Sequence, residues 1–441
     1  MLEAAWDVAA EQVRRCDPIR QLGRVTGLVG MTIEASGLAV PVGSLCRIAG
    51  SRHQPPVLCE AVGFRAGRLL LMPYADMRGI APGHVVVPVA QRLTVPCGEA
   101  LLGRILNGLG EPIDGGPPLR HLPRRRLGQA APAALQRRRS ATALETGIKA
   151  MDALVTVGRG QRMGIFAGSG VGKSVLLGML ARGAEVDVSI LALIGERGRE
   201  VREFIERDLG PEGLARSVVV VVTSDESAVM RTKGAETAMA IAESFREADR
   251  EVLLLMDSAT RYAMALREIG LAAGEPPTTK GYPPSVFAAL PRLCERAGWS
   301  AVNAITAFFT VLIEGDDIQD PVGDAMRSIL DGHVMLSRDL AREGHYPAID
   351  VLGSVSRLRN DVLQASDRQA GDLMLQWLKT LEENRDLVSI GAYAPGSLPL
   401  LDTALRRRPE IRAFLTQDTT DRIPADQSLA QLRTVLELED R

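Results

Sequence analysis

The fold is decided by one stretch, Ala167-Gly168-Ser169-Gly170-Val171-Gly172-Lys173-Ser174. Its glycines allow backbone N–H groups to turn inward around phosphates, while the lysine reaches the β- and γ-phosphates and the serine hydroxyl binds Mg²⁺. Residues 161–166 predict a buried strand, and residues 174–182 predict a helix whose N-terminus faces the anion. The usual first glycine is replaced by Ala167, and a chance glycine-rich turn is the alternative. The context favours a phosphate-binding loop in a nucleotide-hydrolysing enzyme.

Length and composition limit the kind of protein. A chain of 441 residues predicts two or three domains, and 46% hydrophobic with 24% charged residues is typical of a soluble globular protein. The net charge of −2 gives no general attraction to nucleic acid. The five cysteines form no CxxC pair, which argues against zinc and against a disulfide framework. No apolar run is long enough to span a membrane. We therefore expect a cytoplasmic protein.

The pattern along the chain predicts four segments. Residues 1–20 are expected to form an amphipathic helix, in which Trp6 either docks on a partner or packs on the chain's own domain. Residues 21–95 contain short strand-like runs between Gly and Pro, which predict a small β-barrel. Residues 96–360 alternate apolar strands with helices and predict an α/β ATPase domain with a mostly parallel sheet. Residues 361–441 predict a C-terminal helical domain.

Two carboxylates are expected beside the phosphate loop. Asp257 ends the apolar run 253–257, and a carboxylate there can hold Mg²⁺ together with Ser174. Glu196 follows the apolar strand 188–194 and can orient the attacking water. The alternative for Glu196 is a place at the start of a surface helix.

Two further residues are candidates for contacts with the nucleotide. Arg357, in the run Ser354-Val355-Ser356-Arg357, can reach the γ-phosphate of a neighbouring subunit, as arginine fingers do. Tyr346 can offer a flat face to a purine, and its alternative is a core tyrosine. The residues expected to surround the phosphates are Gly168, Ser169, Gly170, Val171, Gly172, Lys173, Ser174 and Val175.

Together these segments resemble the catalytic subunits of F-type and V-type rotary ATPases. They resemble more narrowly the export ATPases of the bacterial flagellum and of type III secretion injectisomes. The Ala at position 167 is typical of the export branch. The resemblance is carried by residues 144–149 (LETGIK), 158–162, 166–174, 194–200 (IGERGRE), 274–287 (GEPPTTKGYPPSVF), 314–317, 329–333 and 345–350 (HYPAID).

The resemblance implies roles for named residues. Glu196 corresponds to the glutamate that polarises water, and Arg197 to its neighbour near the phosphates. Arg357 corresponds to the arginine finger given in trans, and Tyr346 to the tyrosine that stacks on adenine. ATP and Mg²⁺ are the implied substrate and cofactor. The implied fold is a RecA-like P-loop core between an N-terminal β-barrel and a C-terminal helical domain.

The resemblance also implies partners and a location. The chain is expected to form a homohexamer with ATP at subunit interfaces, at the cytoplasmic side of the inner-membrane export apparatus. A regulatory stalk protein would bind the N-terminus. Export-gate membrane proteins, export chaperones and their substrates would bind elsewhere, and nucleic acid would not.

The choice between the two export systems rests on finer detail. Residues 383–393 and 396–397 look flagellar, whereas residues 269–274 and 288–293 look closer to injectisome members. We expect a flagellar ATPase, with an injectisome ATPase as the alternative. A hexameric nucleic-acid translocase of the transcription-terminator type is a second alternative, disfavoured by near-neutral charge and 4% aromatic residues. A non-catalytic ring subunit is disfavoured because Glu196 and Lys173 are both present.

Overall fold

The computed structural model describes residue 6 and residues 21–50, 55–313 and 320–437. The helix predicted for residues 1–20 lies outside these residues except for Trp6, whose side chain is exposed. The resemblance segment 314–317 lies outside them as well.

The chain forms two compact units. The first is Met1–Leu93 with Ala272–Glu275, and the second is Thr94–Leu271 with Pro276–Arg441. The first unit contains the predicted β-barrel, and the second contains both the α/β core and the C-terminal helices. The predicted fold class is confirmed in all three parts, while the residue limits of the predicted domains stay a prediction.

The barrel of the first unit is closed. Among the described residues, six strands follow the order β1-β2-β5-β4-β3-β6 around it. Their inward side chains, such as Val25, Ile33 and Leu71, are buried and fill the interior. Closure leaves no open strand edge for unwanted pairing. The strands are β1 (Gly23–Val29), β2 (Thr32–Ser36), β3 (Leu45–Ile48), β4 (Val57–Arg65), β5 (Arg68–Pro73) and β6 (Val85–Ala90).

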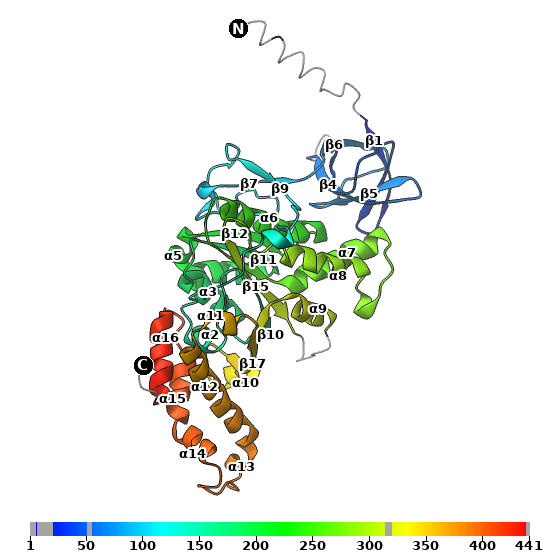
Figure 1. Cartoon of the computed structure of the whole chain (residues 1–441). Coiled ribbons are helices and arrows are strands. Elements are labelled where there is room, and N and C mark those ends of the chain that lie inside the picture. The colour runs from blue at the N-terminus through cyan, green and yellow to red at the C-terminus, as the bar shows by residue number, and fades with distance from the viewer. Residues whose placement is uncertain (1–5, 7–20, 51–54, 314–319, 438–441) are drawn as a thin grey trace. The chain divides into compact units, whose positions relative to one another are not determined.

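The second unit is built on one large sheet (Figure 1). Its order is β17-β16-β10-β15-β13-β11-β12-β8, with β14 paired to β15. All neighbours are parallel except the pairs β16–β17 and β14–β15. The strands are β8 (Ile105–Leu106), β10 (Arg162–Ala167), β11 (Val188–Glu196), β12 (Ser217–Thr223), β13 (Val252–Asp257), β14 (Gly298–Trp299), β15 (Ala304–Leu312), β16 (Gly332–Leu336) and β17 (Ile349–Ser356); β7 (Thr94–Pro96) and β9 (Arg124–Arg126) form a separate pair.

The central strands are almost continuously apolar because helices cover the sheet. Every residue of β11 and β13 is buried, as expected for a parallel sheet enclosed on both faces. Helix α6 packs on β11, β12 and β13, and its first turn is capped by the Ser227 hydroxyl, which accepts from the Met230 N–H. The core helices are α2 (Lys149–Leu154), α3 (Lys173–Gly183), α4 (Gly198–Glu203), α5 (Gly210–Ala215), α6 (Ala228–Glu247), α7 (Ala259–Ala273), α8 (Pro284–Cys294), α9 (Pro321–Ile329), α10 (Arg338–Arg342) and α11 (Arg359–Val362).

The C-terminal helices share their hydrophobic core with the ATPase core. Met374, Trp377 and Leu432 belong to the same buried cluster as residues of β10 and α3, and α16 packs on α2 (Figure 1). No helix among the described residues combines the length and apolar character that a membrane crossing needs. The helices are α12 (Ala365–Glu383), α13 (Arg385–Ser389), α14 (Pro399–Arg406), α15 (Arg408–Leu415) and α16 (Ala425–Val435).

Candidate active site

The phosphate loop connects β10 to α3. Gly170 and Gly172 have φ values of +78° and +92°, which side chains disfavour and glycine adopts easily. Helix α3 begins at Lys173 directly after this turn. The first N–H groups of a helix have no partner within the helix, so they are free to bind an anion. The local sequence therefore builds an anion-binding turn at the end of a buried strand.

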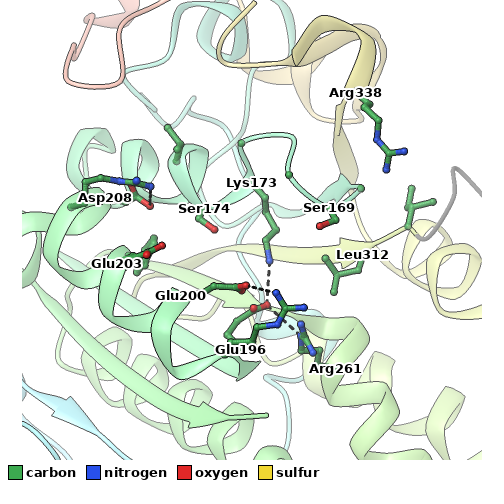
Figure 2. Close-up of a pocket in the computed structure, with 18 residues that line it drawn as sticks. Ser169, Lys173, Ser174, Glu196, Glu200, Glu203, Asp208, Arg261, Leu312 and Arg338 are labelled. Carbon is green, nitrogen blue, oxygen red and sulfur yellow. Dashed lines mark hydrogen bonds and ion pairs between the residues drawn. The ribbon is translucent and has the colours of Figure 1, made fainter. Parts of the chain in front are cut away.

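The loop lines a cavity of about 640 Å³, a size suited to a nucleotide (Figure 2). Gly168, Ser169, Gly170 and the run 172–175 line it, together with Glu196 and Arg197. Val171 does not line it, because its side chain belongs to the hydrophobic core. Lys173 points from the loop toward Glu196, and Arg338 lies on the side of Ser169 and Leu312 (Figure 2).

Lys173 is held between two carboxylates. Its Nζ lies 2.5 Å from Asp257 Oδ1 and 3.3 Å from Glu196 Oε1. Burial opposes the charge of this ammonium group, but the two carboxylates outweigh the burial, so the pKa of Lys173 is raised above its ordinary value. The Thr310 hydroxyl donates to Asp257 Oδ1 at 2.6 Å and fixes that carboxylate further. The lysine is therefore a permanent positive charge aimed into the cavity.

These groups meet because the strands that carry them are parallel. Asp257 is the last residue of β13, Glu196 is the last residue of β11, and the phosphate loop follows β10. The strand β15, which carries Thr310, lies between β10 and β13. Since the carboxyl ends of parallel strands share one edge of a sheet, residues distant in sequence converge there.

The donor groups beside Lys173 fit Mg²⁺. Ser174, Glu196 and Asp257 all line a small cavity of about 20 Å³, which has room for one water-sized occupant. Their donors are oxygens only, which is the preference of Mg²⁺. Within the described residues no cluster of three or more His, Cys, Asp or Glu could hold a metal alone.

One arginine, Arg261, pairs with Glu196. Arg261 Nε lies 3.4 Å from Glu196 Oε1, and Figure 2 shows the two side chains together. Arg261 was not predicted from the sequence, although its position four residues after Asp257 was an available signal. Arg197 lines the cavity, but its side chain is 76% exposed and pairs with Glu200 at 2.8 Å. Arg261 is thus better placed than Arg197 to hold Glu196 within this chain.

Tyr346 lies against the phosphate loop. A methyl group placed on Gly172 would lie 3.6 Å from Cε1 of the Tyr346 ring. The residue is 42% exposed, which does not fit a core tyrosine. Its backbone carbonyl accepts from the N–H of Gln417 at 2.9 Å, and the Gln417 side chain binds the turn at Gly147. The ring therefore offers a free face beside the loop, supported by the C-terminal segment.

Arg357 lies far from its own phosphate loop. It follows β17, whose Ser356 pairs with Gly332 at the start of β16. The other end of β16, Leu336, pairs with Ala167 at the start of the loop. Gly332 and Leu336 are four residue steps apart along β16, which is about 13 Å. Arg357 is exposed at the opposite edge of the sheet. The structure brings Lys173, Ser174, Glu196, Asp257 and Tyr346 together and leaves Arg357 apart.

Two family models match the chain. Residues 147–356 match the nucleotide-binding domain of the ATP synthase alpha/beta family, and residues 363–434 match the C-terminal domain of the type III secretion ATPase EscN. The chain is 51% identical to the flagellum-specific ATP synthase of Salmonella typhimurium, covering 94% of this chain and 93% of that protein. It is 47% identical to the type 3 secretion system ATPase of Xanthomonas euvesicatoria, covering 94% of each.

Solved structures give the same result. The assembled ATPase EscN from the type III secretion system of enteropathogenic E. coli is similar with a TM-score of 0.89 and 41% identity, covering 94% of this chain and 100% of that chain. The same ATPase in complex with its central stalk EscO is similar with a TM-score of 0.87 and 40% identity, again over 94% and 100%. The resemblance predicted from the sequence is confirmed.

Proposed function

The chain belongs to the ATP synthase alpha/beta family, in its branch of flagellar and type III secretion ATPases, and on this basis we propose that it energises flagellar protein export. It is an ATP-hydrolysing enzyme. The observation that carries the proposal is the pairing of Lys173 of the phosphate loop with both Glu196 and Asp257, in a chain 51% identical to a flagellar relative.

The proposed hydrolysis depends on positioning and charge. The phosphate loop binds the ATP phosphates, and Lys173 neutralises the β- and γ-phosphate oxygens. Ser174 and Asp257 would hold Mg²⁺, which neutralises charge on the phosphates when it is bound. Glu196 accepts a hydrogen bond from the attacking water and aligns it with the γ-phosphate. Tyr346 stacks on the adenine ring.

The proposed active unit is a homohexamer with ATP at subunit interfaces. Arg357 cannot reach the loop of its own chain along the sheet, so it would act on the γ-phosphate held by a neighbour. The similarity to assembled EscN supports a ring. The complex of EscN with EscO supports a stalk partner for this chain too. We place the ring at the cytoplasmic side of the inner membrane, near the export gate, its chaperones and its substrates, with a regulatory stalk protein on the N-terminal residues.

The flagellar system is favoured over the injectisome. The identity is 51% and 48% with the flagellar proteins of Salmonella typhimurium and Treponema pallidum, and 47% with the Xanthomonas injectisome ATPase. An ATPase of a virulence or symbiosis injectisome is the second candidate, because the solved relative EscN superimposes over nearly the whole chain.

Complementation separates these two candidates. The gene is expressed in one strain that lacks its flagellar export ATPase and in another that lacks its injectisome ATPase, and secreted flagellin and effector are measured. We expect flagellin export to be restored, with the Lys173→Ala variant inactive. Restoration of effector secretion alone would replace the flagellar proposal with the injectisome one.

A further inference from the structure

Arg338 occupies a place at the phosphate loop that the proposed chemistry has not used. It is the first residue of α10, directly after Ser337, whose hydroxyl caps this helix by accepting from the Leu340 N–H. The preceding strand β16 runs parallel to β10, with Leu336 beside Ala167. Residue 338 therefore lies at the same sheet edge as the start of the loop, and the helix cap fixes its position.

The guanidinium group of Arg338 covers the first glycine of the loop. A methyl group placed on Gly168 would lie 2.9 Å from Nη2 of Arg338 and 3.8 Å from the carbonyl oxygen of Ile313. Arg338 lines the same cavity as Lys173 and Ser169. Figure 2 shows it reaching toward the cavity from the side of Ser169 and Leu312. Gly168 thus leaves space that the guanidinium group fills.

The other basic side chains of this cavity are already paired. Arg338 by contrast has no hydrogen bond or ion pair with any residue that the structure describes. A guanidinium group in a cavity, with five N–H donors and no carboxylate, is suited to a phosphate. The paired groups are Lys173 with Asp257 and Glu196, Arg197 with Glu200 at 2.8 Å, Arg207 with Asp208 at 2.9 Å, and Arg261 with Glu196 at 3.4 Å.

We propose that Arg338 binds the terminal phosphate of the nucleotide and makes the site prefer a triphosphate over a diphosphate. This inference rests on the nucleotide site proposed above. Ser174 and Asp257, the donors proposed for Mg²⁺, line the small cavity of about 20 Å³, and Arg338 does not. The terminal phosphate would therefore be bound by metal and Lys173 from one side and by Arg338 from the other. Hydrolysis and phosphate release would remove the partner of Arg338.

Equilibrium binding tests the inference. The full-length protein is titrated with the non-hydrolysable β,γ-imido analogue of ATP and with ADP, both in the presence of Mg²⁺. A charge-assisted pair is worth about 1.5–3 kcal/mol, so Arg338→Ala should weaken binding of the analogue about 10- to 100-fold. ADP affinity should stay within about threefold, because ADP lacks the terminal phosphate. Arg338→Lys should recover part of the loss, since it keeps the charge but not the fork of donors.

Two controls make the result specific. Arg342, on the same helix, is exposed, pairs with Asp339 at 3.1 Å and does not line the cavity, so Arg342→Ala should bind both nucleotides normally. Lys173→Ala should weaken binding of the analogue even if the role proposed for Arg338 is wrong. Unchanged binding of the analogue by Lys173→Ala would contradict the nucleotide site itself. If Arg338→Ala lost affinity equally for the analogue and for ADP, or lost affinity for neither, the inference about Arg338 would be overturned while the nucleotide site would stand. A lowered melting temperature with unchanged binding would also overturn it and make Arg338 structural.

Discussion

The two edges of the large sheet differ in what their charged residues surround: those of the carboxyl edge line a cavity, and those of the opposite edge do not. At the carboxyl edge, Lys173 is shared between Asp257 and Glu196 and points into a cavity. At the opposite edge, Arg162 is satisfied by Asp331, with Nε and Oδ2 at 2.9 Å, in a contact that joins β10 to the turn before β16. The exposed Arg357 donates its backbone N–H to the Asp331 carbonyl at 3.0 Å, whereas its side chain has no hydrogen bond or ion pair with any described residue.

The carboxyl edge therefore holds the residues that bind the nucleotide, whereas the opposite edge holds the arginine expected to complete the site of a neighbouring subunit. The carboxyl edge brings together within one chain the phosphate loop, the glutamate proposed to orient water and the oxygens proposed to bind Mg²⁺. The opposite edge keeps one arginine free, and the strand geometry places it about four residues, or about 13 Å, from its own loop. One chain therefore has the parts to bind ATP, and a second copy is expected to supply the missing charge. The predictions below test this division.

The largest effect is expected at the carboxyl edge. Lys173→Ala removes the charge that faces the β- and γ-phosphates and takes from Asp257 its partner cation. Steady-state ATP hydrolysis should be abolished. Phosphate release measured on purified protein checks this, with circular dichroism to confirm folding. Activity within a few-fold of the parent would contradict the nucleotidase site.

The second-largest effect is expected for a change in Arg357, at the opposite edge of the sheet. Arg357→Ala should lower turnover about 10³-fold, as expected for loss of an arginine finger, and should do so at every protein concentration. The parent's specific activity should instead rise with concentration as rings form. Mixing Arg357→Ala with Lys173→Ala should recover part of the activity, because some interfaces then combine an intact loop with an intact arginine. Mixed rings that form without any recovery would argue for a role within one chain.

A smaller effect separates chemistry from binding at the carboxyl edge. Glu196→Gln keeps the size of the side chain but removes the charge that polarises water, so turnover should fall about 10²-fold. Binding of the β,γ-imido analogue of ATP should persist. Isothermal titration calorimetry with the imido analogue and phosphate-release assays on the same preparation measure the two quantities. Parallel losses of both would assign Glu196 a structural role.

The smallest effect on stability is expected for a change outside the large sheet, in the N-terminal residues. Deleting residues 1–18 should change the melting temperature by less than about 2 °C, because a short helix contributes little by itself. The deletion should abolish binding of the regulatory stalk protein, measured by co-purification. A large drop in melting temperature with the regulator still bound would show that Trp6 packs on the chain itself.

Much of the site could be predicted because its residues follow local patterns. Lys173 and Ser174 lie in a loop with a recognisable sequence, and Asp257 ends an apolar strand. Arg338, Arg261 and Thr310 were not predicted. Each lies in a common kind of segment, a helix start or a buried strand, and only the order of the strands brings it to the loop. Val171 was predicted to lie around the phosphates, and this stays a prediction: its side chain is part of the core, so the expected contact is that of its backbone N–H group.

The sequence by itself determined the phosphate loop, the alternation of strands and helices, and the family. These depend on neighbouring residues, because glycine conformations, buried-strand patterns and helix starts are local properties. Only the tertiary structure decided which distant side chains share a cavity and which edge of the sheet each occupies. That outcome depends on strand order and direction: β15 and β16 flank β10 although they follow it by more than 130 residues, and the reversal at β17 carries Arg357 away from the loop. The free charges of Arg338 and Arg357, on opposite edges, follow from that arrangement.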